Sequence, residues 1–230
     1  MNLKNIITVN PEINKLRTLA DNMGAKLLPV MKSYQNKVKE FQLASGQPVD
    51  LKRELTKEEL DFRDDLLREE IRELREAIVD NNRVEILDAL CDIKYVNDGT
   101  ANMMGKIQSD SDLESTYNIF TKTLQRNLEG LDTVGVADVS LVNLIVYELA
   151  YLFNFSLENF KAALDRVHAS NMSKFCYDTK TAERTQEFYA KQGVETYVQP
   201  REKKTLVYRK EDGKVLKSVE YHPVILEDLV

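Results

Sequence analysis

Apolar residues recur with helical spacing in the first part of the chain. Residues 11–44 read as helical, because apolar side chains return there every three or four residues and Pro11 suits a first helical turn. The last of these apolar positions are Met31, Tyr34, Val38 and Phe41. Residues 45–50 are rich in small and polar residues, so we expect a loop between this region and the next helix.

The next helix combines an apolar stripe with acidic residues. Thr56 and Glu59 have the spacing of a capping box, which predicts a helix that starts there and runs to Val79. With successive side chains about 100° apart, four apolar residues share one stripe. They are Leu67, Ile71, Leu74 and Ile78. Glu70 falls inside the apolar arc and Glu73 on its edge, whereas Glu69 falls outside it.

A second helix follows a short polar break at 80–82 and is apolar almost all round, from Val84 to Val96. Its acids, Glu85, Asp88 and Asp92, nevertheless lie within roughly 60° of one another. A helix that is apolar all round is normally buried, and unpaired carboxylates there would be strongly desolvated. The short break favours antiparallel packing, which would bring the two sets of acids face to face.

A cation between these carboxylates would offset the cost of their burial. A hard divalent cation such as Mg²⁺ is one candidate, since it prefers oxygen ligands. Arginine is the other, because four arginines are close in sequence: Arg68, Arg72, Arg75 and Arg83. The first three point away from Glu70 by helical phase, which weakens the arginine alternative.

The rest of the chain predicts more helices and a small β-element. Helices are expected over Asp112–Leu128, over Val139–Phe153, from an N-cap at Ser156 to about Asn171, and over Thr181–Lys191. Alternating β-rich runs around 196–198, 205–209 and 215–219 then predict a hairpin or a three-stranded sheet. The expected fold class is therefore mainly α, with a small C-terminal β-hairpin or sheet.

Composition excludes several classes of function. The chain carries 38 acidic and 32 basic residues, a net charge of −6, which argues against a general nucleic-acid-binding surface. Two cysteines and two histidines are too few for a zinc hydrolase or a disulfide framework. No apolar run approaches the roughly 20 residues of a membrane span, and the first residues lack a signal-peptide profile, so we expect a cytoplasmic protein.

The acidic motifs resemble those of a known superfamily. Glu70-x-x-Glu73 followed by Glu85-x-x-Asp88 is similar to the signature of the all-α nucleoside triphosphate (NTP) pyrophosphohydrolases, which include MazG-like proteins, dimeric dUTPases and phosphoribosyl-ATP pyrophosphohydrolase. The surrounding segments, 38–49, 88–101 and 167–174, resemble phage and bacterial MazG-like proteins in order and spacing. The resemblance covers roughly residues 36–105 and 156–222.

The resemblance implies a MazG-like helical bundle that hydrolyses a nucleoside triphosphate to the monophosphate and pyrophosphate. It implies two or three Mg²⁺ or Mn²⁺ ions per site, bridged by Glu70, Glu73, Glu85 and Asp88. Asp92 is a candidate further ligand, and Glu69 a candidate to complete a metal shell or accept the proton of water. Asn171 and Lys174 would bind the substrate. A homodimer or tetramer is expected, in the host cytoplasm if a phage encodes the chain.

The sequence divides into three expected parts: a helical extension over 1–35, a catalytic domain over 36–176 with a helical insertion at about 106–155, and a tail over 177–230. Two other functions stay open at this point. One is a catalytically idle module that binds a nucleotide or a protein on the same scaffold. The other is a structural helical oligomer whose acids pair with arginines across an interface. The sequence does not identify the base or sugar of a nucleotide substrate.

Overall fold

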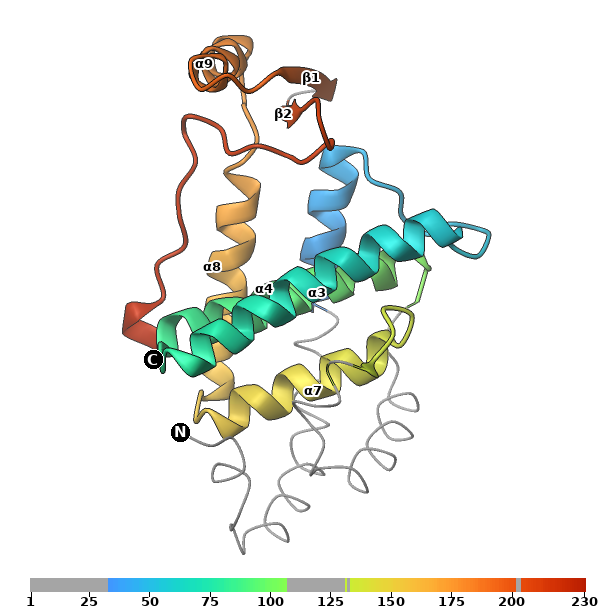
Figure 1. Cartoon of the computed structure of the whole chain (residues 1–230), viewed down its shortest axis with the longest axis vertical. Coiled ribbons are helices and arrows are strands. Elements are labelled where there is room, and N and C mark those ends of the chain that lie inside the picture. Colours follow the sequence, from blue (N-terminus) through green and yellow to red (C-terminus); the bar gives the residue numbers. More distant parts are fainter. Residues whose placement is uncertain (1–32, 107–130, 132, 202–203) are drawn as a thin grey trace, which may run out of the picture.

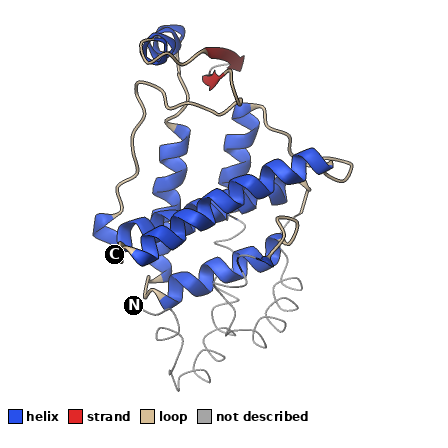
Figure 2. Ribbon diagram, viewed as in Figure 1, coloured by secondary structure: helices blue, strands red, loops and turns tan. Residues whose placement is uncertain are grey.

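The computed structural model describes residues 33–106, 131, 133–201 and 204–230. Over these residues the protein is mainly helical, with one antiparallel hairpin of two strands (Figures 1 and 2). Residues 33–45 form a helix, as expected. The region expected to be helical before residue 33 and the helix expected over Asp112–Leu128 lie outside the described residues. No described helix is both long and apolar enough to cross a membrane.

The two acid-bearing helices predicted from the sequence are confirmed, and they pack against each other. Helix α3 spans Lys57–Val79, and the side chains of Thr56 and Glu59 form the expected capping box at its start. Helix α4 spans Arg83–Met103 and is capped by Asn82. The two helices are antiparallel, since Arg63 near the start of α3 donates hydrogen bonds to Thr100 and Val96 in the second half of α4.

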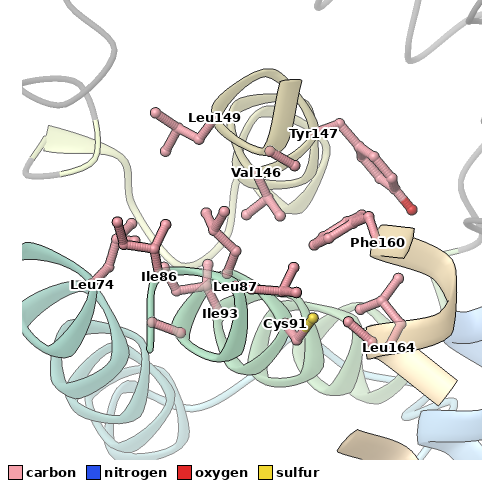
Figure 3. Packing of buried hydrophobic residues seen from close by; sticks show 14 of the residues in the cluster. Leu74, Ile86, Leu87, Cys91, Ile93, Val146, Tyr147, Leu149, Phe160 and Leu164 are labelled. Atoms are coloured by element: carbon pink, nitrogen blue, oxygen red, sulfur yellow. The ribbon is translucent and has the colours of Figure 1, made fainter. Parts of the chain in front are cut away.

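The core forms where α4 packs against α3, α7 (Val139–Leu152) and α8 (Leu157–Met172). Figure 3 shows Leu87 and Cys91 of α4 facing Val146 of α7 and Phe160 of α8. All four side chains are buried. The buried helix expected over Val139–Phe153 is therefore confirmed, and so is the N-cap of α8 at Ser156.

A charged pair lies inside this core. The Nζ atom of Lys94 is 2.7 Å from Oδ2 of Asp98, one turn further along α4, and neither side chain is exposed. Asn143 of α7 joins them, since its Nδ2 donates to Asp98 and its Oδ1 accepts from Lys94, both at 3.2 Å. This polar link between α4 and α7 satisfies groups that would otherwise be costly to bury.

The C-terminal part consists of α9 (Thr179–Ala190), β1 (Thr196–Arg201) and β2 (Lys204–Arg209), at one end of the molecule (Figure 1). The two strands pair antiparallel with Tyr197 opposite Tyr208. Of the two β-structures expected, the hairpin is the one that forms. The third run contributes an isolated bridge between Val215 and Tyr208 and no strand of its own.

Contacts with the helices hold the hairpin and the chain that follows it. Tyr208 donates a hydrogen bond to the carbonyl oxygen of Ser45, at 3.1 Å, and packs with Phe41 and Phe175. After the hairpin, the chain runs back along α8 to the short helix η2 (Glu227–Leu229) (Figure 1). There Asp228 forms an ion pair with Arg166 of α8.

Candidate metal and nucleotide site

The antiparallel pairing of α3 and α4 brings together the acids that sequence reasoning selected. Glu70 and Glu73 of α3 act electrostatically on Asp88 and Asp92 of α4, which places the two sets across from each other. Glu85 lies one turn before Asp88 and raises its pKa. We call these residues, Glu70, Glu73, Glu85, Asp88 and Asp92, the carboxylate patch.

Burial and mutual repulsion make three acids of the carboxylate patch, Glu70, Asp88 and Asp92, hold protons more tightly than isolated acids, whereas the side chains of Glu73 and Glu85 are exposed. Burial raises the pKa of Glu70 to about 7, with further contributions from Glu73, Glu69 and Asp88. Burial likewise raises the pKa of Asp88 to about 6, helped by Glu85 and Glu73. The pKa of Asp92 lies well above its ordinary value for the same reasons, with Glu70 and Asp88 contributing most after burial. These acids therefore share a site in which the ionised form of each carboxyl group is less favourable than in water.

Three of the four nearby arginines contact groups outside the patch. Arg68 pairs with Asp64 at 3.2 Å, and Arg72 lies 3.9 Å from Glu76. Arg83 donates to the carbonyl oxygen of Phe153. Within the described part of the chain, no carboxylate of the patch forms a hydrogen bond or ion pair through its side chain. These three arginines thus give no support to the arginine alternative within one chain.

Lysines approach the patch from the C-terminal half of the chain. Lys174 follows the end of α8, and its positive charge is close to Asp92 and Glu70. Its Nζ donates to Oδ1 of Asn171 at 2.5 Å, so these two residues are adjacent, with Asn171 in the last turn of α8. Burial lowers the pKa of Lys174, while Asp92 opposes that effect.

Two further lysines were missed by sequence reasoning. Nζ of Lys214 lies 3.6 Å from Oε1 of Glu69, and the charge of Lys217 lowers the pKa of Asp88. Glu69 lies outside the apolar arc, as helical phase predicts, and yet it is close enough to raise the pKa of Glu70. No local pattern marked the lysines, because only the folding of the tail back over α8 brings them here.

The donor chemistry of the patch fits a hard divalent cation. All five side chains offer carboxylate oxygens, which are the ligands that Mg²⁺ and Mn²⁺ prefer. Among the described residues, however, no three His, Cys, Asp or Glu side chains are grouped closely enough to hold a metal ion as they stand. A metal shell therefore requires these side chains to rotate toward a common centre.

The raised pKa values predict how the metal-free protein responds to pH. The folded state keeps protons on Glu70 and Asp88 up to about pH 7 and 6, whereas ordinary carboxyls lose theirs near pH 4. The unfolded state binds fewer protons in this window, so the free energy of unfolding falls as pH rises from about 4 to 7 and then levels off. Allowing for partial exposure, we expect a loss of roughly 2 kcal/mol.

Urea titrations between pH 4 and 8 with a chelator present measure this loss. The double variant Glu70→Gln/Asp88→Asn is the matched control and should show a flatter profile. Equal pH dependence in both proteins would contradict the electrostatic account of the patch.

Comparisons with known proteins identify a family match over the part of the chain that carries the patch. The sequence profile of the phosphoribosyl-ATP pyrophosphohydrolase family matches residues 38–117, a span that contains α3, α4 and the whole carboxylate patch. An uncharacterized protein of Acanthamoeba polyphaga mimivirus is 32% identical over an alignment that covers 67% of this chain and 76% of that protein. No solved structure matches the chain at a significant level.

Proposed function

The chain belongs to the phosphoribosyl-ATP pyrophosphohydrolase family, part of the all-α NTP pyrophosphohydrolase superfamily, and from this premise we propose that it hydrolyses a nucleoside or deoxynucleoside triphosphate to the monophosphate and pyrophosphate. Members of the family are pyrophosphohydrolases. The observation that carries the proposal is the carboxylate patch, in which the desolvated acids Glu70 of α3 and Asp88 and Asp92 of α4 face one another. Such a group of acids is stabilised best by divalent cations.

The acids of the patch have distinct proposed roles. Glu70, Glu73, Glu85 and Asp88 would hold two or three Mg²⁺ or Mn²⁺ ions, with Asp92 as a further ligand or as an acceptor behind them. Bound cations of this kind neutralise the triphosphate and make a coordinated water acidic enough to attack phosphorus near neutral pH. Glu69, beside Glu70 and with its side chain 39% exposed, would accept the proton of that water or complete the metal shell.

Asn171 and Lys174 would bind the nucleotide itself. Their hydrogen bond fixes the ammonium group of Lys174 at the end of α8, close to Asp92 and Glu70. A lysine held there can offset the charge that grows on the leaving pyrophosphate. The amide of Asn171 orients the lysine and can also donate to a sugar or phosphate oxygen.

Product analysis by chromatography tests the reaction class. The purified protein is incubated with each common NTP and dNTP, with Mg²⁺ and with chelator. We expect the monophosphate and pyrophosphate to appear only when Mg²⁺ is present. Diphosphate plus inorganic phosphate would contradict the proposed cleavage site. A folded protein that binds nucleotides but turns none over would favour the idle binding module instead.

The proposal includes the assembly and the division of the chain. We infer that residues 36–176 form the catalytic unit, including the insertion at about 106–155, and that 1–35 and 177–230 are additions to it. We also infer a homodimer or tetramer, because two acidic helices cover only part of a nucleotide. Light scattering coupled to size-exclusion chromatography distinguishes these states from a monomer.

A further inference from the structure

The segment after the hairpin brings two lysines to the edge of the carboxylate patch. Lys214 lies 3.6 Å from Glu69, and Lys217 is close enough to Asp88 to lower its pKa. The hydrogen bond from Ser218 to Ser173 places the segment that carries Lys214 and Lys217 beside Lys174, and both lysines lower the pKa of Lys174. Positive charges from two distant parts of the sequence therefore gather at the edge of one acidic site.

Backbone and side-chain contacts fix the segment on both sides of Lys217. The amide of Leu216 donates to the carbonyl oxygen of Val207 in β2, at 2.9 Å. Ser218 donates to the carbonyl oxygen of Ser173 at 3.1 Å, and the carbonyl oxygen of Lys217 itself accepts from Tyr189 of α9, also at 3.1 Å. The lysines thus extend from a backbone that is held to β2, α8 and α9.

The lysines keep their ammonium groups accessible. The side chain of Lys214 is 57% exposed and that of its partner Glu69 is 39% exposed, so their ion pair is weak and is readily exchanged for another anion. Lys217 is also exposed, with its Nζ 4.6 Å from the ring centre of Tyr221. Besides neutralising the acids, these lysines can bind another anion, because exposed ammonium groups on a fixed backbone beside the carboxylate patch suit a polyphosphate.

We propose that Lys214 and Lys217, together with Lys174, form a phosphate-binding rim that grips the pyrophosphate end of the substrate, its β- and γ-phosphates. This inference rests on the proposed function and gives the tail a role in the same site. The divalent cations would neutralise the carboxylates, and the three lysines would then face the phosphate oxygens beyond them. The ligand class is a diphosphate group, either within a nucleotide or as free pyrophosphate.

Calorimetric binding of inorganic pyrophosphate in the presence of Mg²⁺ tests the rim without requiring turnover. Lys214→Gln and Lys217→Gln should each raise the Kd by about tenfold, and the double variant by about a hundredfold. Lys210→Gln is the matched control, since Lys210 lies in the same tail but pairs with Glu195 at 3.3 Å. Replacing Lys214 and Lys217 together with Arg, in place of Gln, should keep the Kd within about threefold of the wild-type value, because Arg keeps the charge.

Each outcome of these binding measurements supports or overturns the proposed phosphate-binding rim. Weaker binding in the Gln variants, with normal binding in the Lys210→Gln and Arg variants, supports it. Binding unchanged in the double Gln variant overturns it and leaves the lysines as partners of the acids alone. Failure of the wild-type protein to bind pyrophosphate also overturns it. Rim-dependent binding without hydrolysis of any nucleotide would instead uphold the rim and refute the proposed function. Thermal melts show whether each variant is folded.

Discussion

Glu70→Gln and Asp88→Asn should each reduce pyrophosphohydrolase turnover by at least about a hundredfold and leave the metal-free protein as stable as before, or more stable. Turnover falls because an amide is a poorer ligand for Mg²⁺ than a carboxylate. Stability does not fall because both acids are desolvated and repelled by neighbouring carboxylates, which raises their pKa values to about 7 and about 6. A neutral amide of the same shape removes that repulsion.

The matched control is Glu76→Gln. Glu76 lies on the same helix, is exposed, and faces Arg72 at 3.9 Å rather than α4. The Glu76→Gln variant should retain wild-type turnover. Initial rates with Mg²⁺ and urea midpoints with a chelator are measured on all the variants. Turnover retained in Glu70→Gln, or a large loss of stability with it, would show that this acid is a structural residue and not a metal ligand.

Lys94→Met should lower the free energy of unfolding by about 3–5 kcal/mol, because it leaves the carboxylate of Asp98 buried without its cation. Both side chains are wholly buried, and the amide of Asn143 alone does not compensate for a buried charge. Burial already raises the pKa of Asp98, while Lys94 lowers it. Losing Lys94 therefore removes the group that keeps this carboxylate charged.

Lys57→Met provides the comparison, since Lys57 and Asp61 have the same spacing on a helix and a similar distance, 2.9 Å, but side chains that are 85% and 61% exposed. It should change stability by no more than about 0.5 kcal/mol. The double variant Lys94→Met/Asp98→Leu should recover most of the loss. Urea unfolding gives all of these values. If Lys94→Met and Lys57→Met lowered the free energy of unfolding by similar amounts, burial would not explain the contribution of the Lys94–Asp98 pair.

Local sequence patterns predicted the parts of the fold that depend on near neighbours. The capping box at Thr56 and Glu59, the N-cap at Ser156 and the buried helix beginning at Val139 follow from residues within a few positions of one another. Helical phase also identified the acids of the patch, because the acids of each set lie on a single helix. The face-to-face arrangement followed from the short break between the helices, which leaves the chain little choice but to reverse.

Features that depend on distant residues were not predicted. Lys94 and Asp98 interrupt a helix that reads as apolar, and only the position of Asn143 on α7 explains how their charges are accommodated. Lys214 and Lys217 follow an ordinary turn, and nothing near them in sequence connects them to Glu69 or Asp88. Helical phase assigns a direction to each side chain, but it does not say which segment packs above it.

The path of the chain after the hairpin also affects when the site can form during synthesis. The carboxylates of α3 and α4 leave the ribosome well before Lys214 and Lys217. These lysines reach the site only when their segment contacts Ser173 and β2. The same segment then continues along α8 to the pair of Arg166 and Asp228. A nascent chain would thus have its acids in place before the lysine rim is complete, so full affinity for the substrate would be reached only after the tail has folded.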